Sequence, residues 1–388
     1  MKNNNIKLMY CISFLQGMVF YASIATLYRT SSGLNLFSIS LIESICCILM
    51  IILEIPWGIL ADRIGYRHTM IICSFLYFVS KIVFWTASNF LMFLIERVIL
   101  SVVYSGLSGV DSSIIYLSSE KEKSQRSFGI YTALGTAGLM ISAGICSLTV
   151  GTDYRLAGLL TIFPYGIAAI ISLFLKEVKE ENKEKENMSK VITVLHETLQ
   201  NRQLIYLIIG GGLMSEAVHM LTVFLNQPKY SEIGMSTTLI SAAYIGMTAV
   251  SLLSVYSDKL AKRFGFERTG IGLFLLIIFS SILLSFTQLP LAAVSCITAI
   301  KLADALIQPL LMKSEHDLIH SADRATVISA GAFLTDFIVI IIDLIMGRIA
   351  DINVNYSILA GTIFITIGLA MFMMSRKKAN ALQATEQN

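Results

Sequence analysis

Long apolar runs recur along the chain and are separated by short polar segments. A helix that crosses a bilayer needs about 20 mainly apolar residues, at a rise of about 1.5 Å per residue. Twelve runs meet this length, at residues 7–28, 37–61, 69–88, 90–117, 127–150, 155–175, 203–226, 236–257, 269–288, 290–312, 326–347 and 353–374. The first is longer than the apolar part of a signal peptide, so we interpret it as a retained helix. The pattern predicts an all-α polytopic membrane protein with twelve transmembrane helices.

The composition favours lipid as the main solvent. Hydrophobic residues make up 55% of the chain and charged residues only 14%, whereas soluble domains carry about 25% charged residues. The six cysteines lie in apolar runs and are interpreted as small buried side chains, not as disulfides or metal ligands. The net charge of +3 is no signal for nucleic acid.

Lysine and arginine are concentrated in alternate loops. With the N-terminus placed inside, the outer segments hold only Arg29, Arg155, Lys229 and Arg348. Because basic loops stay in the cytoplasm, we expect both termini to be cytoplasmic, in a multi-pass protein of a bacterial-type cell membrane.

A charged stretch divides the chain into two halves of six helices. It runs from Lys176 to Lys190 with five lysines and five glutamates, which indicates a solvated linker. The expected organisation is an N-terminal six-helix bundle at 1–175, a cytoplasmic linker at 176–202, a second bundle at 203–375 and a tail at 376–388. The loop residues Ala61, Arg63, Gly65 and Thr69 recur as Ala261, Arg263, Gly265 and Thr269. Such internal repeats are how many secondary transporters are built.

One of these loops carries a family signature. The stretch Gly58-Ile-Leu-Ala-Asp62-Arg63-Ile-Gly65-Tyr-Arg67 closely resembles the loop 2–3 motif of the major facilitator superfamily. Arg97 falls where the second motif of that family has its intramembrane arginine. The resemblance implies two pseudo-symmetric bundles, alternating access, and an Asp62–Arg63 group that locks the cytoplasmic side.

Two positions depart from the pattern of the proton-coupled drug exporters in that family. Their fifth helix carries a Gly-Pro pair, whereas Met140 stands at the proline position here, between Gly138 and Gly144. The second-half loop has Lys262 in place of the aspartate.

Charged side chains within spans are costly, so each one is a candidate for function. Arg97, Ser101, Tyr104, Ser108 and Asp111 recur at steps of four and three, which predicts one polar face of a continuous helix. We expect Arg97, Tyr104 and Asp111 to line a substrate or proton pathway, and the two serines to form bonds between helices.

Helix 2 carries two carboxylates on one face, Glu43 and Glu54. Glu54 is the candidate partner of Arg97, a proton carrier, or a structural link between helices 2 and 4, and these alternatives stay open. Glu43 is expected to be solvated near the outer surface. Glu96 is expected to point about 100° away from Arg97.

In the second half, Glu216, Asp304 and Asp336 are the candidates for the pathway. Lys301 and Asp304 are one turn apart and predict an ion pair within the helix. Lys81, in the first half, is assigned a structural role.

The chain shows no signature of an enzyme. It lacks a nucleotide-binding Gly-Lys-Ser/Thr loop and a dinucleotide fingerprint. His316 and His320 have the spacing of a zinc helix but no evident third ligand. We therefore predict no metal and no cofactor.

The resulting hypothesis is a secondary transporter, monomeric in the bilayer, that exports a small amphipathic drug or metabolite coupled to protons. Two alternatives stay open: a nutrient importer or facilitator of the same fold, and a membrane sensor or scaffold that transports nothing.

Overall fold

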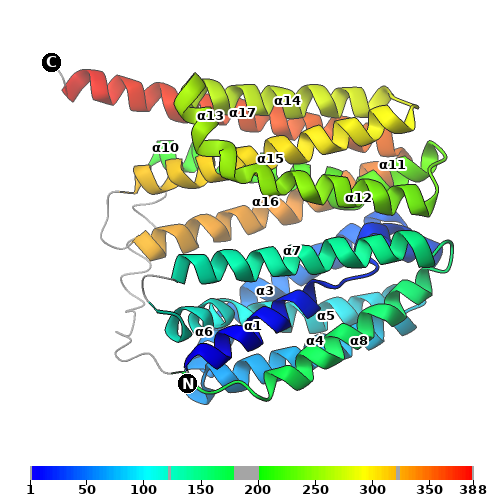
Figure 1. Ribbon diagram of the computed structural model, residues 1–388. Helices are drawn as coiled ribbons and strands as arrows, with labels where there is room; N and C mark the ends of the chain where they lie inside the picture. Colours follow the sequence, from blue (N-terminus) through cyan, green and yellow to red (C-terminus); the bar gives the residue numbers. More distant parts are fainter. Residues whose placement is uncertain (1, 121–123, 179–200, 320–323, 387–388) are drawn as a thin grey trace. The chain divides into compact units, whose positions relative to one another are not determined.

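The computed structural model describes residues 2–120, 124–178, 201–319 and 324–386, and all regular elements in these ranges are helical (Figure 1). They are α1 (Lys2–Gly17), η1 (Ala22–Ile24), α2 (Ala25–Ser31), α3 (Leu36–Ile64), α4 (Tyr66–Thr86), α5 (Phe90–Leu107), α6 (Val110–Ser118), α7 (Ser124–Thr149), α8 (Tyr154–Ser172), α10 (Arg202–His219), η3 (Met220–Leu225), α11 (Asn226–Glu232), α12 (Thr237–Ser251), η4 (Leu252–Tyr256), α13 (Ser257–Phe264), α14 (Phe266–Phe286), α15 (Pro290–Leu318), α16 (Arg324–Ile352) and α17 (Val354–Glu386).

Twelve helical spans in the described residues are long and apolar enough to cross a membrane. They coincide with the twelve predicted runs; the second, for example, covers Leu36–Ile64 where the pattern predicts 37–61. The prediction of an all-α, multi-pass membrane protein is therefore confirmed.

Loop residues set where several spans begin. Asn35, Asn89, Asp153 and Asn201 each accept a hydrogen bond, through the side chain, from the backbone amide three residues later. These caps satisfy amides that have no partner within the helix. α15 begins instead with Pro290, whose missing N–H costs nothing at a first helical position.

Four spans contain interruptions that the apolar pattern does not predict. The first span changes from α1 through η1 to α2. The fourth ends as α5 at Leu107 and resumes as α6 at Val110, because Gly109 between them has φ +77°. In the seventh span the π-helix η3 separates α10 from α11, and such π segments are frequent at functional sites. The eighth span changes from α12 through η4 to α13.

The repeated loop sequence produces the same backbone in both halves. Gly65 and Gly265 have φ +88° and +86°, each between two helices that follow directly on one another. In both loops the threonine four residues later donates its hydroxyl proton to the glycine carbonyl, at 3.0 Å for Thr69 and 2.7 Å for Thr269. The recurrence of Gly and Thr thus has a local structural cause.

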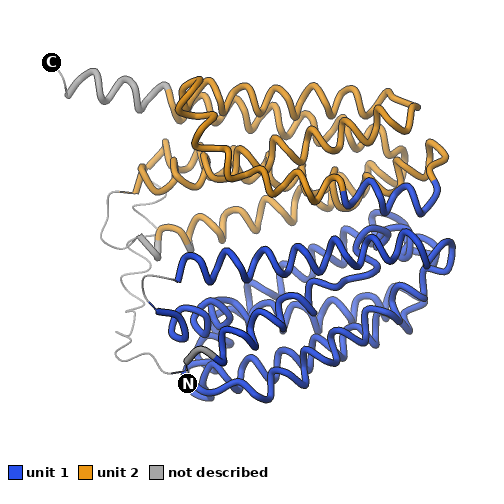
Figure 2. The backbone as a smooth tube through the Cα atoms, in the orientation of Figure 1, with its two compact units in different colours: residues 1–183, 236–245 blue, residues 184–235, 246–388 orange. Residues whose placement is uncertain are grey.

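The chain divides into two compact units (Figure 2). Unit 1 comprises residues 1–183 and 236–245, and unit 2 comprises residues 184–235 and 246–388. Residues 236–245 group with unit 1, although the sequence places them in the second bundle. Residues 179–200 of the predicted linker and 387–388 of the predicted tail lie outside the described residues.

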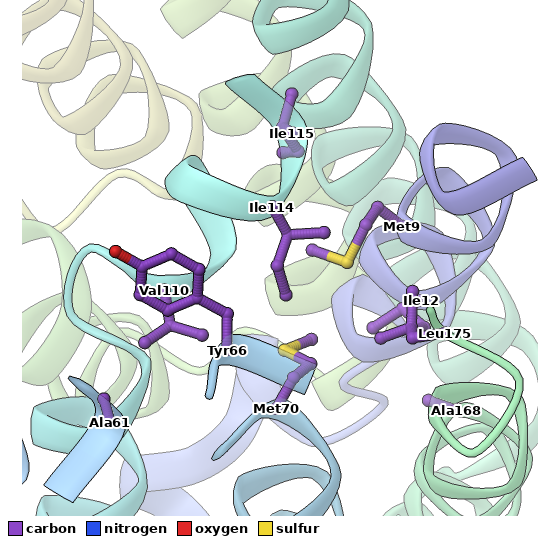
Figure 3. Close-up of a cluster of buried hydrophobic side chains, with 10 residues drawn as sticks. All are labelled: Met9, Ile12, Ala61, Tyr66, Met70, Val110, Ile114, Ile115, Ala168 and Leu175. Atoms are coloured by element: carbon purple, nitrogen blue, oxygen red, sulfur yellow. The ribbon is translucent and has the colours of Figure 1, made fainter. Parts of the chain in front are cut away.

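One hydrophobic cluster of unit 1 joins helices that are distant in sequence (Figure 3). Its members are Met9, Ile12, Ala61, Tyr66, Met70, Val110, Ile114, Ile115, Ala168 and Leu175. They come from α1, α3, α4, α6 and the region of α8, so the cluster fixes the ends of these helices against each other.

Candidate functional site

A carboxylate on the second span of unit 1 joins two arginines from other spans. Glu43 Oε1 on α3 lies 2.9 Å from Arg29 Nη1 at the end of α2, and 2.7 Å from Arg97 Nη2 on α5. The Arg29 side chain is 1% exposed, and those of Glu43 and Arg97 are 16% and 18% exposed. Unpaired ions are costly in an apolar interior, so the carboxylate that the two arginines share stabilises their charges there, and the three side chains together keep one positive charge.

Glu96 extends this ionic network. Its carboxylate is 1% exposed, and its Oε2 lies 3.6 Å from Arg97 Nε. This distance is longer than a hydrogen bond. Neither Glu96 Oε2 nor Arg97 Nε has a hydrogen-bond partner among the described residues. Because an unpaired buried polar atom costs about 1–3 kcal/mol, the pair can bind a polar group that both donates and accepts.

Lys81 lies beside the ionic network, among tyrosines. Its buried Nζ on α4 donates to the hydroxyl of Tyr21 at 3.0 Å and lies 4.8 Å from the ring centres of both Tyr77 and Tyr165. Tyr77 in turn donates to the hydroxyl of Tyr104 at 3.4 Å. Aromatic faces attract a buried cation. These tyrosines therefore surround the Lys81 ammonium with aromatic faces and hydroxyl groups.

The structure corrects two expectations for helix 2. Glu54 is exposed on α3, eleven residues and therefore about 16 Å along the helix from Glu43. Glu43, which was expected to be solvated, is the observed partner of Arg97. The sequence places both carboxylates on one face of α3, but only Glu43 lies at the depth of Arg97.

The predicted polar face of helix 4 ends at the interruption near Gly109. Asp111 lies in the first turn of α6, where its Oδ1 accepts from the amide of Ser112 at 2.6 Å and its Oδ2 accepts from the hydroxyl of Tyr131 at 3.4 Å. Ser101 donates to the carbonyl of Val98 within its own helix, at 2.8 Å. The predicted grouping of Arg97 with Glu54 and Asp111 is therefore replaced by Arg97 with Glu43 and Glu96.

Unit 2 holds a separate polar cluster on α10 and α15. Asp304 pairs with Lys301 at 3.0 Å, as the spacing predicts. Gln308 Nε2 donates to Asp304 Oδ1 at 2.9 Å and to Ser215 Oγ at 2.8 Å, which links the two helices.

Two other predicted residues of unit 2 lie on neighbouring elements. Glu216 is buried at the end of α10, and its Oε1 lies 3.1 Å from His219 Nδ1, directly before the π-helix η3. Asp336 is half-buried on α16. A role for Glu216, Asp304 or Asp336 in a pathway stays a prediction.

Comparison with known proteins identifies the family. A model of the Major Facilitator Superfamily matches residues 7–342. The chain belongs to the major facilitator superfamily. It is also 29% identical over 194 residues to an uncharacterized MFS-type transporter of Methanocaldococcus jannaschii, and this match spans 48% of the chain and 49% of that relative, about half of each.

Solved major facilitator structures share the fold. A crystal structure of a mutant of the nucleoside transporter NupG superposes with a TM-score of 0.81 at 15% identity, and covers 96% of this chain and 100% of that one. A bacterial homolog of the human lysosomal transporter Spinster, inward-facing and occupied, gives 0.75 at 16% identity, and covers 96% of each chain. At these identities the likeness shows the fold alone.

Besides Gly65, a second member of the loop 2–3 motif of this major facilitator protein has a clear local role. Arg67 donates from Nε to the carbonyl of Leu175 at 2.6 Å and from Nη2 to that of Leu173 at 3.2 Å. It thereby caps carbonyls that follow the end of α8. Gly58, Asp62 and Arg63 are exposed on the last turns of α3. Their role as a cytoplasmic lock stays a prediction.

Reasoning from the sequence missed most of the ionic network around Arg97. The sequence analysis places Arg29 in an outer segment, Glu43 in solvent near the outer surface, and Glu96 about 100° away from Arg97. The structural role assigned to Lys81 stays a prediction. One signal was available: Arg29 directly follows an apolar run, and Glu43 is a carboxylate within the next one. Because spans 1 and 2 are joined by a short loop, charges near that loop can meet.

Proposed function

We propose that this major facilitator protein is a secondary active transporter that exports a small amphipathic drug or metabolite in exchange for protons. The observation that carries the proposal is the carboxylate of Glu43, which forms ion pairs with both Arg29 and Arg97 within the apolar interior of unit 1. Tyr77 and Tyr165 now pack against Lys81, and in this proposal their rings contact the apolar part of the substrate once the helices rearrange.

Protonation of Glu43 would change the balance of this network. The network and its neighbour hold three basic side chains, Arg29, Lys81 and Arg97, and two carboxylates, Glu43 and Glu96. A proton on Glu43 removes the negative charge that two buried arginines share, so the same arrangement becomes unfavourable. A proton can thus drive a rearrangement of the helices that carry these residues.

Competition for the carboxylates supports exchange over co-transport. A substrate that donates a hydrogen bond to Glu43 or Glu96 needs that carboxylate in its ionised form. Protonation of the carboxylate removes this form. Binding of the proton therefore weakens binding of the substrate, and binding of the substrate weakens binding of the proton by the same factor. An antiporter uses this linkage.

The experiment uses inverted membrane vesicles with an acidic interior and a panel of small amphipathic compounds. A substrate of an exporter should enter these vesicles and release protons from them, which a pH-sensitive dye reports. Proton movement in the same direction as the substrate would indicate an importer. Uptake that does not depend on the proton gradient would indicate a facilitator. Absence of transport for every compound in the panel would favour the sensor or scaffold.

Two matched variants test the proton carrier. Glu43→Gln and Glu54→Gln remove the same charge from the same helix, but only Glu43 contacts Arg97. We expect Glu43→Gln to abolish the pH dependence of substrate exchange, and Glu54→Gln to retain it. Loss of the pH dependence in Glu54→Gln alone would contradict the assignment.

A further inference from the structure

A groove in unit 2 lies between α13 and α14. It has a volume of about 390 Å³ and is lined by Leu260, Arg263, Phe264, Arg268, Thr269, Gly272 and Leu273. Arg263 and Arg268 are exposed, and the other walls are mostly apolar. We propose that this groove binds an acidic phospholipid of the surrounding bilayer.

The charges near the groove match an anionic headgroup. Four basic residues and two acidic residues lie between positions 258 and 268: Lys259, Lys262, Arg263 and Arg268, with Asp258 and Glu267. Asp258 lies 2.6 Å from Lys262, so this carboxylate is already engaged. In the part of the chain that the structure describes, neither Arg263 nor Arg268 forms an ion pair. Two arginines at the end of a membrane span are well placed to bind a lipid phosphate.

The apolar surface below the arginines matches an acyl chain. A Cβ atom added at Gly272 would meet nothing within 4 Å, so the floor of the groove is open at this position. Leu275, Leu276 and Phe279 follow on the same face of α14 and are 51%, 38% and 65% exposed. The groove therefore continues along the helix as an apolar strip, which free phosphate or a water-soluble anion would not use.

The binding experiment measures lipid retained by the purified protein in native mass spectrometry. The probes are phosphatidylglycerol and phosphatidylcholine with the same acyl chains, and inorganic phosphate as a competitor. We expect the protein to prefer phosphatidylglycerol. The double variant Arg263→Gln/Arg268→Gln should lower its affinity roughly 30-fold, the factor that corresponds to about 1 kcal/mol for each of two basic residues near an acidic membrane surface.

Two further variants distinguish lipid binding in the groove from attraction by the overall positive charge of the loop. Lys262→Gln removes one charge from the same loop but from a residue engaged with Asp258, so the preference should persist. Gly272→Leu places a side chain on the floor, where an added Cβ meets nothing within 4 Å, and should weaken binding of both lipids. Melting temperatures in phosphatidylcholine confirm that each variant is folded.

Four results would overturn the proposal. They are equal binding of the two lipids, unchanged binding by the double variant, complete displacement of the lipid by phosphate, and a dimer that the same arginine substitutions dissociate. The last two would assign the groove to a free anion or to a second copy of the chain.

Discussion

At the scale of single residues, Glu43 shows how one side chain determines where others can be buried. Its Oε1 is shared by two guanidinium groups, and Arg29 is 1% exposed. Removing one partner of a buried ion pair costs about 3–5 kcal/mol, because the other charge stays buried. The periodicity of α3 gives the face that Glu43 occupies. Its partners follow only from which helices pack beside that face.

The two loop glycines allow a prediction with an internal control. Both have a positive φ that other residues adopt at a cost of about 1–3 kcal/mol. A Cβ at Gly65 would also lie 2.6 Å from Glu177 Oε2, whereas a Cβ at Gly265 would meet nothing within 4 Å. The Glu177 carboxylate can move away from an added methyl group, but it then gives up the bond that it accepts from the Arg67 amide at 3.4 Å. We therefore expect Gly65→Ala to lower the melting temperature slightly more than Gly265→Ala does. Equal decreases in melting temperature for the two variants would show that backbone strain accounts for the whole effect.

At the scale of elements, close approach of helix backbones depends on small residues in the span. Gly17 on α1 and Gly135 and Gly138 on α7 bring these two helices into backbone contact. Within a bilayer, such contacts are a main source of helix association, because the hydrophobic effect does not drive helices together there. Gly138 thus has a packing role in this chain, although Met140 replaces the family's proline nearby.

Two substitutions on α7 test this packing. A Cβ at Gly138 would collide with the carbonyl oxygen of Phe14, whereas Gly129 on the same helix has open space around it. We expect Gly138→Ala to destabilise unit 1 by about 1–3 kcal/mol through overpacking. Gly129→Ala should be neutral or stabilise by up to about 1 kcal/mol through helix propensity. Unfolding in detergent by denaturant measures both, and a loss in Gly129→Ala as large as in Gly138→Ala would contradict the packing argument.

At the scale of the whole molecule, the direction in which the chain crosses the membrane follows from its loops. The twelve candidate spans in the described residues, an even number, predict that both ends lie on one side of the membrane. The excess of Lys and Arg in alternate loops predicts that this side is the cytoplasm.

Labelling of single cysteines tests this orientation. In a background without the native cysteines, Thr152→Cys lies in the loop between α7 and α8, and Glu120→Cys lies between α6 and α7. A maleimide that cannot cross the membrane should label Thr152→Cys in intact cells and Glu120→Cys only in inverted vesicles. The reverse pattern would place the termini outside.

The sequence by itself determined the twelve spans and the glycine loops. Hydropathy is a property of continuous segments, and a left-handed turn depends on one local residue. Only the tertiary structure decided that Glu43, and not Glu54, meets Arg97, and that Lys81 lies among tyrosines. Periodicity assigns a side chain to a face of a helix, but its depth in the bundle and its neighbours depend on how separate helices pack. The interruption at Gly109 likewise ended the polar face that periodicity predicts for the fourth span.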